Sequence, residues 1–347
     1  MPSRQLADSL EPHHESARVP VPAEAHIPGV EEHFITVNGV EWRYLRAGSG
    51  PALVLLHGLM GYSWSWRFNL RELSQNFTVY APDFPGCGFS QRADSLSGSL
   101  ESDAEGVIAL MDALGVRHFH LLGSSRGGGV AIVLAGLLAQ RGMMSRLPRM
   151  ILSAPINPWS EFGQQRTRWL NTLVGRSCVI HLAPRLPSIL RTYYRKLYGD
   201  PSRIAEGSME GYAAGLLVPR SFHHLARIVS VWHPDLLRVE ATLPLIQQVP
   251  ILLLWGSQDA AVYPSSAYEL EKRLANSATN IMEGIGHLPY EEAPAEFNHI
   301  VSEFLLRHHP PGNLELADCD VAASLGRHAG EPSDRNRPQT QSFVQEC

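Results

Sequence analysis

Short apolar runs alternate with longer amphipathic stretches through most of the chain. The runs are rich in β-branched residues, and several are apolar at nearly every position, as expected of parallel strands covered on both faces. The predicted strands are His33–Val37, Val40–Arg46, Ala52–Leu56, Thr78–Ala81, Phe119–Leu122, Met150–Leu152, Ile251–Trp255 and Asn280–Met282. The pair Asn38-Gly39 between the first two runs is a strong hairpin signal. The sheet is therefore expected to begin antiparallel and to continue parallel.

Helical spacing occupies the stretches between these runs. One set of apolar positions follows the i, i+3, i+4, i+7 pattern of a helix face: Val107, Leu110, Met111 and Leu114. Gly115 is placed to end that helix, and the same spacing recurs over residues 297–305 before Pro310-Pro311 stops it. Strands that alternate with helices of this size predict an α/β fold with an open, mostly parallel sheet.

The alternation stops between residues 157 and 248. This stretch has no clear strand, and its prolines and glycines divide it into short helical pieces rich in aromatic residues. A long helical insertion after the sixth strand predicts a cap over a pocket, and the alternative is an enlarged helical layer. We expect Trp159, Trp169 and Trp232 either to line an apolar substrate pocket or to pack between the cap helices. The predicted core comprises residues 31–156 and 249–309.

Composition excludes several classes of protein. Apolar residues make up 44% of the 347 positions and the net charge is −5, which favours neither nucleic acid nor an anionic membrane as partner. Residues 1–30 lack the apolar region of a secretory signal and predict a mobile arm, and residues 310–347 predict a disordered tail. No apolar run is long enough to cross a bilayer, and the four cysteines are far apart without a CxxC pair. We expect a cytoplasmic enzyme without cofactor or metal.

Gly123-Ser124-Ser125-Arg126-Gly127 carries the first chemical signal. It follows the strand Phe119–Leu122 directly and opens a long apolar helical stretch. A sharp turn from strand to helix needs small residues on both sides, and it holds a serine hydroxyl above the sheet at the positive end of the helix. Ser125 is therefore the predicted nucleophile, although the five-residue pattern alone is weak.

A serine hydroxyl needs a base within hydrogen-bond reach to act as a nucleophile near neutral pH. Asp259 follows the strand Ile251–Trp255, and His287 follows the last strand, so both are expected at the carboxyl edge of the sheet, where Ser125 also lies. A neutral histidine can take the serine proton, while an aspartate fixes its tautomer. The sequence thus predicts His287 as general base and Asp259 as the orienting acid.

Negative charge on the substrate oxygen requires preorganised donors. The backbone N–H of Arg126, at the start of the helix, is one candidate. The second is expected from the loop after Ala52–Leu56, from the N–H of Leu59 or alternatively of Met60. His57 in the same loop is interpreted as structural rather than catalytic.

Several segments together resemble the α/β-hydrolase superfamily, of the type with a serine nucleophile and a helical cap. They are Leu56-His57-Gly58, Asp83-Phe84-Pro85-Gly86-Cys87-Gly88-Phe89-Ser90, Gly123–Gly127, Trp255–Asp259 and Gly284–His287. The similarity covers about residues 30 to 308. It implies an eight-stranded sheet, a cap at the position of the insertion, and a catalytic triad of Ser125, Asp259 and His287.

One departure within the superfamily narrows the chemistry. Trp64-Ser65-Trp66-Arg67 and Arg126-Gly127-Gly128 are similar to epoxide hydrolases and haloalkanoate dehalogenases, which attack through a carboxylate where this chain has Ser125. Acyl transfer to serine followed by hydrolysis remains, and it predicts a carboxylic-ester hydrolase for a small or medium acyl substrate. Cleavage of a C–C bond or an amide with the same triad, and a non-catalytic receptor or scaffold, are the alternatives.

Arg126 offers a further hypothesis about the substrate. A guanidinium beside the nucleophile can pair with a substrate carboxylate, as similar arginines do in the haloalkanoate dehalogenases. The second arginine found there has no counterpart, since the equivalent position is Gly129. The alternative is that Arg126 binds a neighbouring acidic residue as part of the scaffold.

Overall fold

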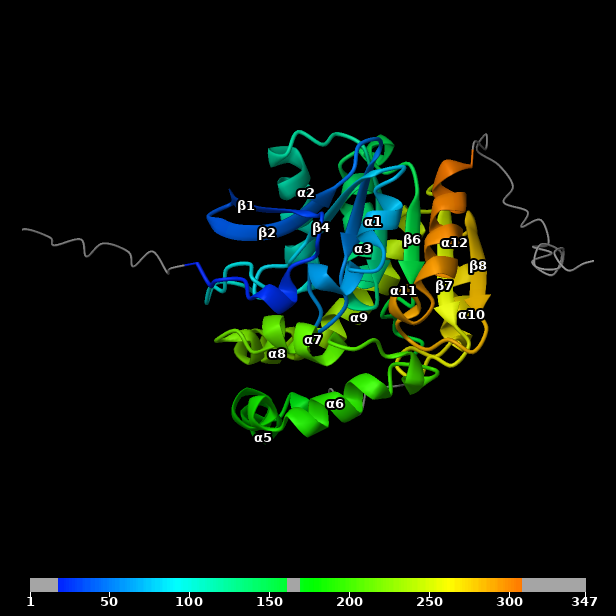
Figure 1. Ribbon diagram of the computed structural model, residues 1–347. Coiled ribbons are helices and arrows are strands. Elements are labelled where there is room, and N and C mark those ends of the chain that lie inside the picture. The colour runs from blue at the N-terminus through cyan, green and yellow to red at the C-terminus, as the bar shows by residue number, and fades with distance from the viewer. Residues whose placement is uncertain (1–17, 161–168, 308–347) are drawn as a thin grey trace, which may run out of the picture. The chain divides into compact units, whose positions relative to one another are not determined.

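The computed structural model describes residues 18–160 and 169–307, and its centre is one mixed sheet (Figure 1). The strands are β1 Glu31–Val37, β2 Val40–Ala47, β3 Ala52–Leu56, β4 Thr78–Pro82, β5 Phe119–Ser124, β6 Met150–Ser153, β7 Ile251–Gly256 and β8 Ser277–Met282. Their order is β1-β2-β4-β3-β5-β6-β7-β8. β2 is antiparallel to β1 and β4, and all other neighbours are parallel. The predicted fold class and the antiparallel start are confirmed.

A tight hairpin joins β1 to β2. Asn38 and Gly39 have φ angles of 52° and 77°, and Val37 pairs with Val40 across the turn. Positive φ at both central residues is the geometry of a type I′ turn, which favours asparagine followed by glycine. The local sequence therefore sets the register of this edge of the sheet.

Helices cover both faces of the sheet. In chain order, the α-helices that the structure describes are α1 Leu70–Leu73, α2 Leu100–Ala113, α3 Arg126–Gln140, α5 Leu173–Ser177, α6 Pro187–Arg195, α7 Ser208–Leu216, α8 Ser221–Ser230, α9 Trp232–Thr242, α10 Ser265–Glu271, α11 Pro289–Glu292 and α12 Pro294–Leu306. The strands show why two layers form: Val54 and Leu56 of β3 point into the cluster with α2 and α3, whereas Leu53 and Leu55 point into the cluster with α1 and α12. This alternation is the period of two that strands impose on their side chains.

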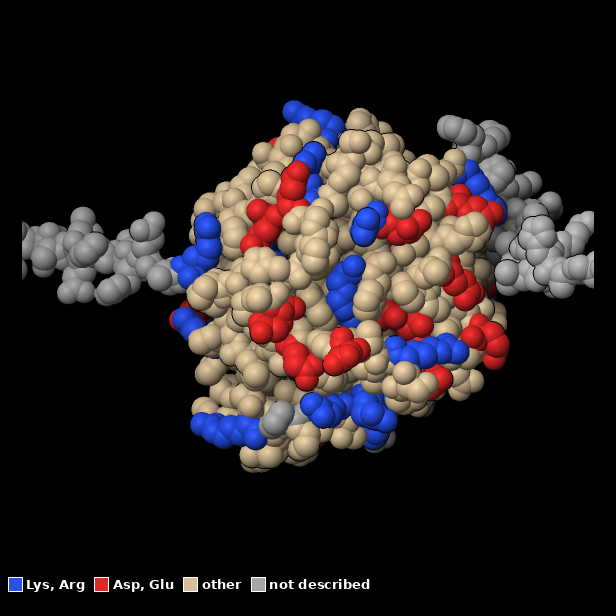
Figure 2. All heavy atoms as spheres, in the orientation of Figure 1, with Lys and Arg blue, Asp and Glu red and all other residues tan. Residues whose placement is uncertain are grey.

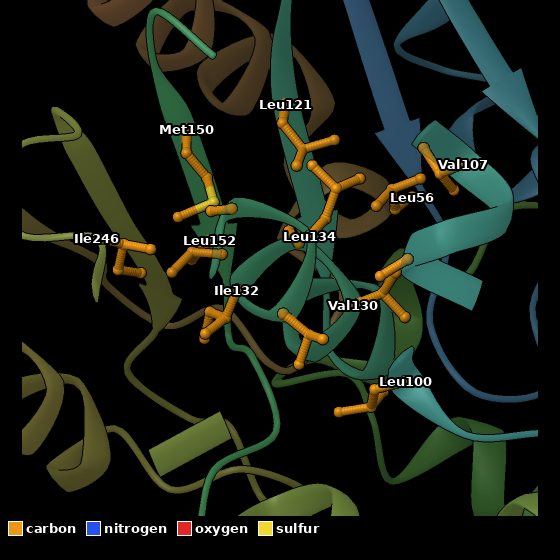
Figure 3. Close-up of a cluster of buried hydrophobic side chains, with 14 of the residues drawn as sticks. Leu56, Leu100, Val107, Leu121, Val130, Ile132, Leu134, Met150, Leu152 and Ile246 are labelled. Atoms are coloured by element: carbon orange, nitrogen blue, oxygen red, sulfur yellow. The ribbon is translucent and has the colours of Figure 1, made fainter. Parts of the chain in front are cut away.

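The larger cluster surrounds α3. Figure 3 shows Val130, Ile132 and Leu134 of this helix among buried side chains of the sheet, such as Leu121 and Leu152, and of flanking elements such as α2. All of these side chains are buried. α3 is thus held firmly on the sheet. The residues at its N-terminus are therefore also fixed relative to the sheet.

The described part of the stretch between β6 and β7 has helices joined by turns and no strand, and its helices fall into two groups. α9, at its end, packs against α3: a Cβ added at Gly136 would collide with the side chain of Thr242. α7 and α8 instead lie beyond the ends of the strands (Figure 1). The enlarged-layer interpretation therefore fits α9, while the preceding helices have the position expected of a cap.

Residues 18–30 are packed rather than extended from the fold. A short 3-10 helix, η1 Ala23–Ala25, contacts α7, and Ala25 is fully buried in a cluster with Tyr62 and Trp64. The last part of the predicted mobile arm, residues 18–30, is therefore packed against the fold. The first part of that arm and the predicted tail at 310–347 lie outside the described residues.

Charged side chains of both signs are interspersed over the face seen in Figure 2, with basic ones gathered along its lower edge, over α5 and α6. This mixed distribution agrees with the small net charge of −5. Within residues 18–160 and 169–307, none of the helices has both the length and the apolar character needed to cross a membrane.

Candidate active site

Ser125 lies in the sharp turn between β5 and α3. Its φ and ψ angles are 52° and −117°, a strained conformation for a residue with a Cβ. A Cβ added at Gly123 would collide with Gly127, and one at Gly127 would collide with the carbonyl oxygen of Leu56. The Ser125 N–H donates to the carbonyl oxygen of Ser153 on β6 at 2.9 Å. The two glycines thus allow the turn, and the neighbouring strand fixes the serine at the carboxyl edge of the sheet.

His287 and Asp259 are joined by a hydrogen bond at the same edge. His287 Nδ1 lies 2.7 Å from Asp259 Oδ2, and both side chains are buried. The other carboxylate oxygen, Oδ1, accepts from the N–H groups of Ala261 and Val262 at 2.7 and 2.9 Å. An ionised aspartate accepts only, so Nδ1 carries the proton and Nε2 has a free lone pair. This is the tautomer that a base for a serine hydroxyl requires.

The loops that carry these two residues are bonded to each other. Gln258 N–H donates to the carbonyl oxygen of Ile285 at 2.8 Å, and Gly284 N–H donates to Ser257 Oγ at 2.9 Å. These two hydrogen bonds lie next to Asp259 and His287 in the chain. They therefore hold the two side chains together in addition to the hydrogen bond between Asp259 and His287.

Glu292, which the sequence analysis did not single out, braces the histidine loop. Its buried carboxylate accepts from Gly286 N–H at 2.8 Å and from the N–H groups of Gly199 and Asp200 at 3.0 and 2.8 Å. His287 N–H donates to the carbonyl oxygen of Leu197 at 2.6 Å. The segment after α6 and the loop before His287 are therefore fastened together. The only sequence signal was an acidic pair, Glu291-Glu292, just before the final helix.

The predicted oxyanion loop lies against the elbow. A Cβ placed on Gly58 would be 3.2 Å from Ser125 Cβ, so the glycine permits this close approach. Arg126 is the first residue of α3, and its N–H is among the helix donors that have no partner within the helix. Leu59 and Met60 follow Gly58 directly, and Met60 has a φ of 62°. Gly58, which directly precedes the predicted donor Leu59, and Arg126 thus both lie next to Ser125.

Asp83 ties the oxyanion loop to the next loop. It is fully buried and accepts from the N–H groups of Ser63 and Phe89 at 2.7 and 2.9 Å. Arg43, also fully buried, donates to it at 3.1 Å. A carboxylate paired in this way is costly to disturb, because losing one partner leaves a buried charge uncompensated.

His57 has the contacts of a structural residue. Its Nε2 accepts from Phe84 N–H at 3.1 Å, and Nδ1 donates to the carbonyl oxygen of Gly58 at 2.9 Å. Burial lowers the pKa of His57 to about 4, so the ring is neutral near pH 7. Both ring nitrogens are used to hold the loop.

Buried histidines should make the protein less stable as the pH falls. Burial lowers the pKa of His57 and of His120 to about 4 and that of His224 to about 3, whereas an unfolded histidine titrates near about 6.5. Below about pH 6.5 the unfolded state binds more protons, so the free energy of unfolding should decline from there to about pH 4. Urea unfolding at a series of pH values measures this decline.

The matched variant for this test is His120→Leu. His120 Nδ1 is buried without a hydrogen-bond partner among the described residues, and the ring packs on Phe77. Removing this titrating group should flatten the decline. An unfolding free energy that does not change between about pH 7 and pH 5 would contradict the prediction.

Arg126 forms a buried ion pair. Its Nη1 donates to Asp103 Oδ2 at 2.7 Å, and its Nη2 donates to the carbonyl oxygen of Gly98 at 2.7 Å. Burial raises the pKa of Asp103, and the guanidinium opposes that shift. These are the contacts of the scaffold alternative, because they direct the guanidinium to α2 and the loop before it.

Arg126→Met should therefore destabilise the protein rather than alter substrate preference. It leaves Asp103 buried without its partner, which typically costs about 3–5 kcal/mol in the free energy of unfolding. Any activity lost should be lost equally for acidic and neutral esters. The double variant Arg126→Met/Asp103→Leu should recover part of the stability. A rise in KM confined to acidic esters would restore the substrate-anchor interpretation.

A pocket opens beside the predicted oxyanion loop. Its lining comes from three places: Leu59, Met60 and Gly61; Gly86, Cys87 and Gly88; and Gly215, Leu216, Ser221, His224, Leu225 and Ile228 of the helical insertion. The walls are mostly apolar, as in pockets that hold small organic ligands.

The three predicted pocket tryptophans lie outside this lining. The guanidinium of Arg273 stacks on Trp159, and its Cζ lies 4.2 Å from the centroid of the indole ring. Trp232 packs against the larger core cluster, and Trp169 is 53% exposed. Trp159 and Trp232 therefore have the contacts of the packing alternative.

Known proteins share this architecture. A family model described as alpha/beta hydrolase fold matches residues 51–294. An uncharacterized protein of Mycobacterium tuberculosis is 27% identical over 332 residues, 90% of this chain and 91% of that protein. The monoacylglycerol lipase ABHD6 of Homo sapiens is 23% identical over 277 residues, 79% of this chain and 80% of the lipase. The crystal structure of a membrane phospholipase A, a bacterial virulence factor, matches with a TM-score of 0.66 and 26% identity, covering 81% of this chain and 87% of that one.

Proposed function

Because the chain belongs to the alpha/beta hydrolase fold family, we propose that it is a serine hydrolase that cleaves carboxylic esters of small or medium acyl groups. The observation that carries this proposal is a serine in a strained turn at the sheet edge where His287 and Asp259 are hydrogen-bonded. The lipases among the similar proteins support the same reaction class.

The proposed reaction begins with transfer of the Ser125 hydroxyl proton to His287 Nε2 as Oγ attacks the ester carbonyl. The N–H groups of Arg126 and Leu59 bind the resulting oxyanion, with Met60 N–H as the alternative to Leu59. His287 then gives its proton to the departing alcohol, which leaves an acyl ester on Ser125. Water, deprotonated by the same histidine, releases the acid and restores the serine. Asp259 stabilises the imidazolium at each stage.

The position of the pocket supports the proposed acyl group. Its mostly apolar walls lie beside Leu59 and Met60. Sites for small organic ligands are lined predominantly by apolar side chains. α7 and α8 form the far wall, so the helical insertion is proposed to act as a cap that limits acyl length.

Two measurements test the proposal. A fluorophosphonate should label Ser125, as read by peptide mass spectrometry, and it should not label the Ser125→Ala variant. A panel of p-nitrophenyl esters of graded chain length, beside amides and diketone acids, should show turnover of the esters. Turnover of diketone acids alone would favour C–C hydrolysis, and absence of both labelling and turnover would favour a receptor or scaffold.

A further inference from the structure

A second pocket lies next to the first, on the side of α8, and we call it the arginine pocket. It is lined by Arg92, Ala93, Leu96, Arg220, His223, His224 and Arg227. His224 lines both pockets. The arginine pocket therefore lies beside the region where the proposed acyl group would lie.

Positive charge in the arginine pocket exceeds the negative charge that faces it. Arg220 and Arg227 both donate to one carboxylate oxygen, Oδ1 of Asp94. Arg92 donates to neutral oxygens: the carbonyls of Ser90 and Gly88 at 3.0 and 2.6 Å and the hydroxyl of Ser221 at 2.9 Å. Asp83 acts on Arg92 through space, but it is held by Arg43. Three guanidinium groups are thus matched by one bonded carboxylate among the described residues, and an anion would find a net positive site.

The start of α8 adds to this potential. The helix begins at Ser221, has ten residues, and carries no side-chain cap at its N-terminus. Arg220 is the N-cap, His223 and His224 belong to the first turn, and all three line the arginine pocket. The positive end of the helix dipole favours an anion there.

His224 is a buried polar group without a partner. Its side chain is 5% exposed, and neither ring nitrogen has a hydrogen-bond partner in the described part of the chain. The ring lies against Gly86, where any Cβ would collide with it. Burial lowers the pKa of His224 to about 3, and the positive charges of Arg126, Arg227 and Arg92 add to this effect. A neutral imidazole without a partner leaves one N–H donor available, and buried donors are normally paired.

We propose that the arginine pocket binds the anionic group of the ester substrate, a carboxylate or phosphate oxyanion, through Arg92, Arg220, Arg227 and His224. In this proposal, the chain that links the anion to the ester passes Leu59 and Met60, which line the first pocket, on its way to Ser125. This inference rests on the proposed ester hydrolysis and deepens it, since it assigns the substrates to acidic esters.

Matched substrates test the carboxylate form. The p-nitrophenyl monoesters of succinate, adipate and sebacate are compared with p-nitrophenyl butanoate, hexanoate and decanoate, which lack only the terminal carboxylate. Arg220→Gln and Arg227→Gln should each raise KM for the preferred acidic ester by about tenfold and leave its neutral counterpart within about twofold. Equal effects on the two series would overturn the inference.

Asp94→Asn should change KM for the acidic ester in the opposite direction. Its carboxylate competes with the ligand for Arg220 and Arg227 and is largely exposed. Removing this charge should lower KM for the acidic ester, which a merely destabilised fold would not do. Arg238→Gln is the matched control, because Arg238 pairs with one surface carboxylate, Glu101, away from the arginine pocket. A control variant that behaves like Arg227→Gln would overturn the assignment.

Binding of inorganic phosphate provides a readout that is independent of turnover. Isothermal titration calorimetry at low ionic strength should show saturable phosphate binding to the Ser125→Ala variant. The double variant Ser125→Ala/Arg227→Gln should not bind phosphate. Phosphate binding without any ester turnover would refute the proposed hydrolysis and leave the anion site standing. Ester turnover with neither preference for acidic esters nor phosphate binding would refute the anion site alone.

Discussion

Replacing Ser125 by alanine should abolish ester turnover and leave the fold intact. The hydroxyl is the proposed attacking group, and loss of such a nucleophile typically lowers kcat by about 10⁶-fold. The N–H of residue 125 still reaches the Ser153 carbonyl, and alanine keeps the Cβ that the turn already accommodates. Turnover of p-nitrophenyl esters and urea unfolding, measured on the same purified samples, separate catalysis from stability.

Ser124→Ala is the control for this prediction. Ser124 is the last residue of β5 and is fully buried, directly before the proposed nucleophile. Its substitution removes a hydroxyl of the same size one position away and should cost little activity. A Ser125→Ala variant that retains near wild-type rate would show that the nucleophile is assigned wrongly.

The sheet could be predicted because each strand has a local signature. Ala52–Leu56 and Ile251–Gly256 are apolar at almost every position, since both of their faces are covered. The hairpin at Asn38-Gly39 depends on the φ angles of two adjacent residues. The elbow at Ser125 could also be predicted from local sequence. A Cβ at Gly123 would collide with Gly127, and one at Gly127 would collide with the backbone at the end of β3.

Contacts between distant segments could not be predicted in this way. Glu292 accepts from Gly199 and Asp200, which are far away in the sequence, so nothing near Glu292 indicates that it braces the histidine loop. Arg126 is similar: whether it faces the substrate or Asp103 depends on where α2 lies. Aromatic content alone could not decide whether the three tryptophans line a pocket or pack between helices, because an indole packs equally well on an arginine or a core helix.

The place of α9 within the helical insertion could not be predicted for a related reason. α9 has the same helical composition as its neighbours, and only its packing on α3 assigns it to the layer on the sheet. Residues 18–30 lack periodicity, yet Ala25 fills a site between the loop after β3 and α7. Burial of a small residue by tertiary contacts leaves no periodic pattern to read.

Asp259→Asn should lower kcat by up to about 10⁴-fold while changing stability little. In the folded protein, Oδ1 of Asp259 accepts from Ala261 and Val262 N–H, and Oδ2 accepts from His287 Nδ1. An asparagine would keep its oxygen at the two N–H groups, which places its NH₂ group opposite Nδ1. His287 Nδ1 must then accept, so its proton moves to Nε2, and Nε2 can no longer take the proton of Ser125.

A double variant distinguishes this explanation from a general disturbance of the site. If Asp259 acts only through His287 on Ser125, removing the nucleophile makes its contribution irrelevant. Ser125→Ala/Asp259→Asn should then be no slower than Ser125→Ala alone, because residues that act as one unit lose activity non-additively. Losses that multiply in the double variant, or an Asp259→Asn rate within about tenfold of wild type, would mean that Asp259 does not orient the base.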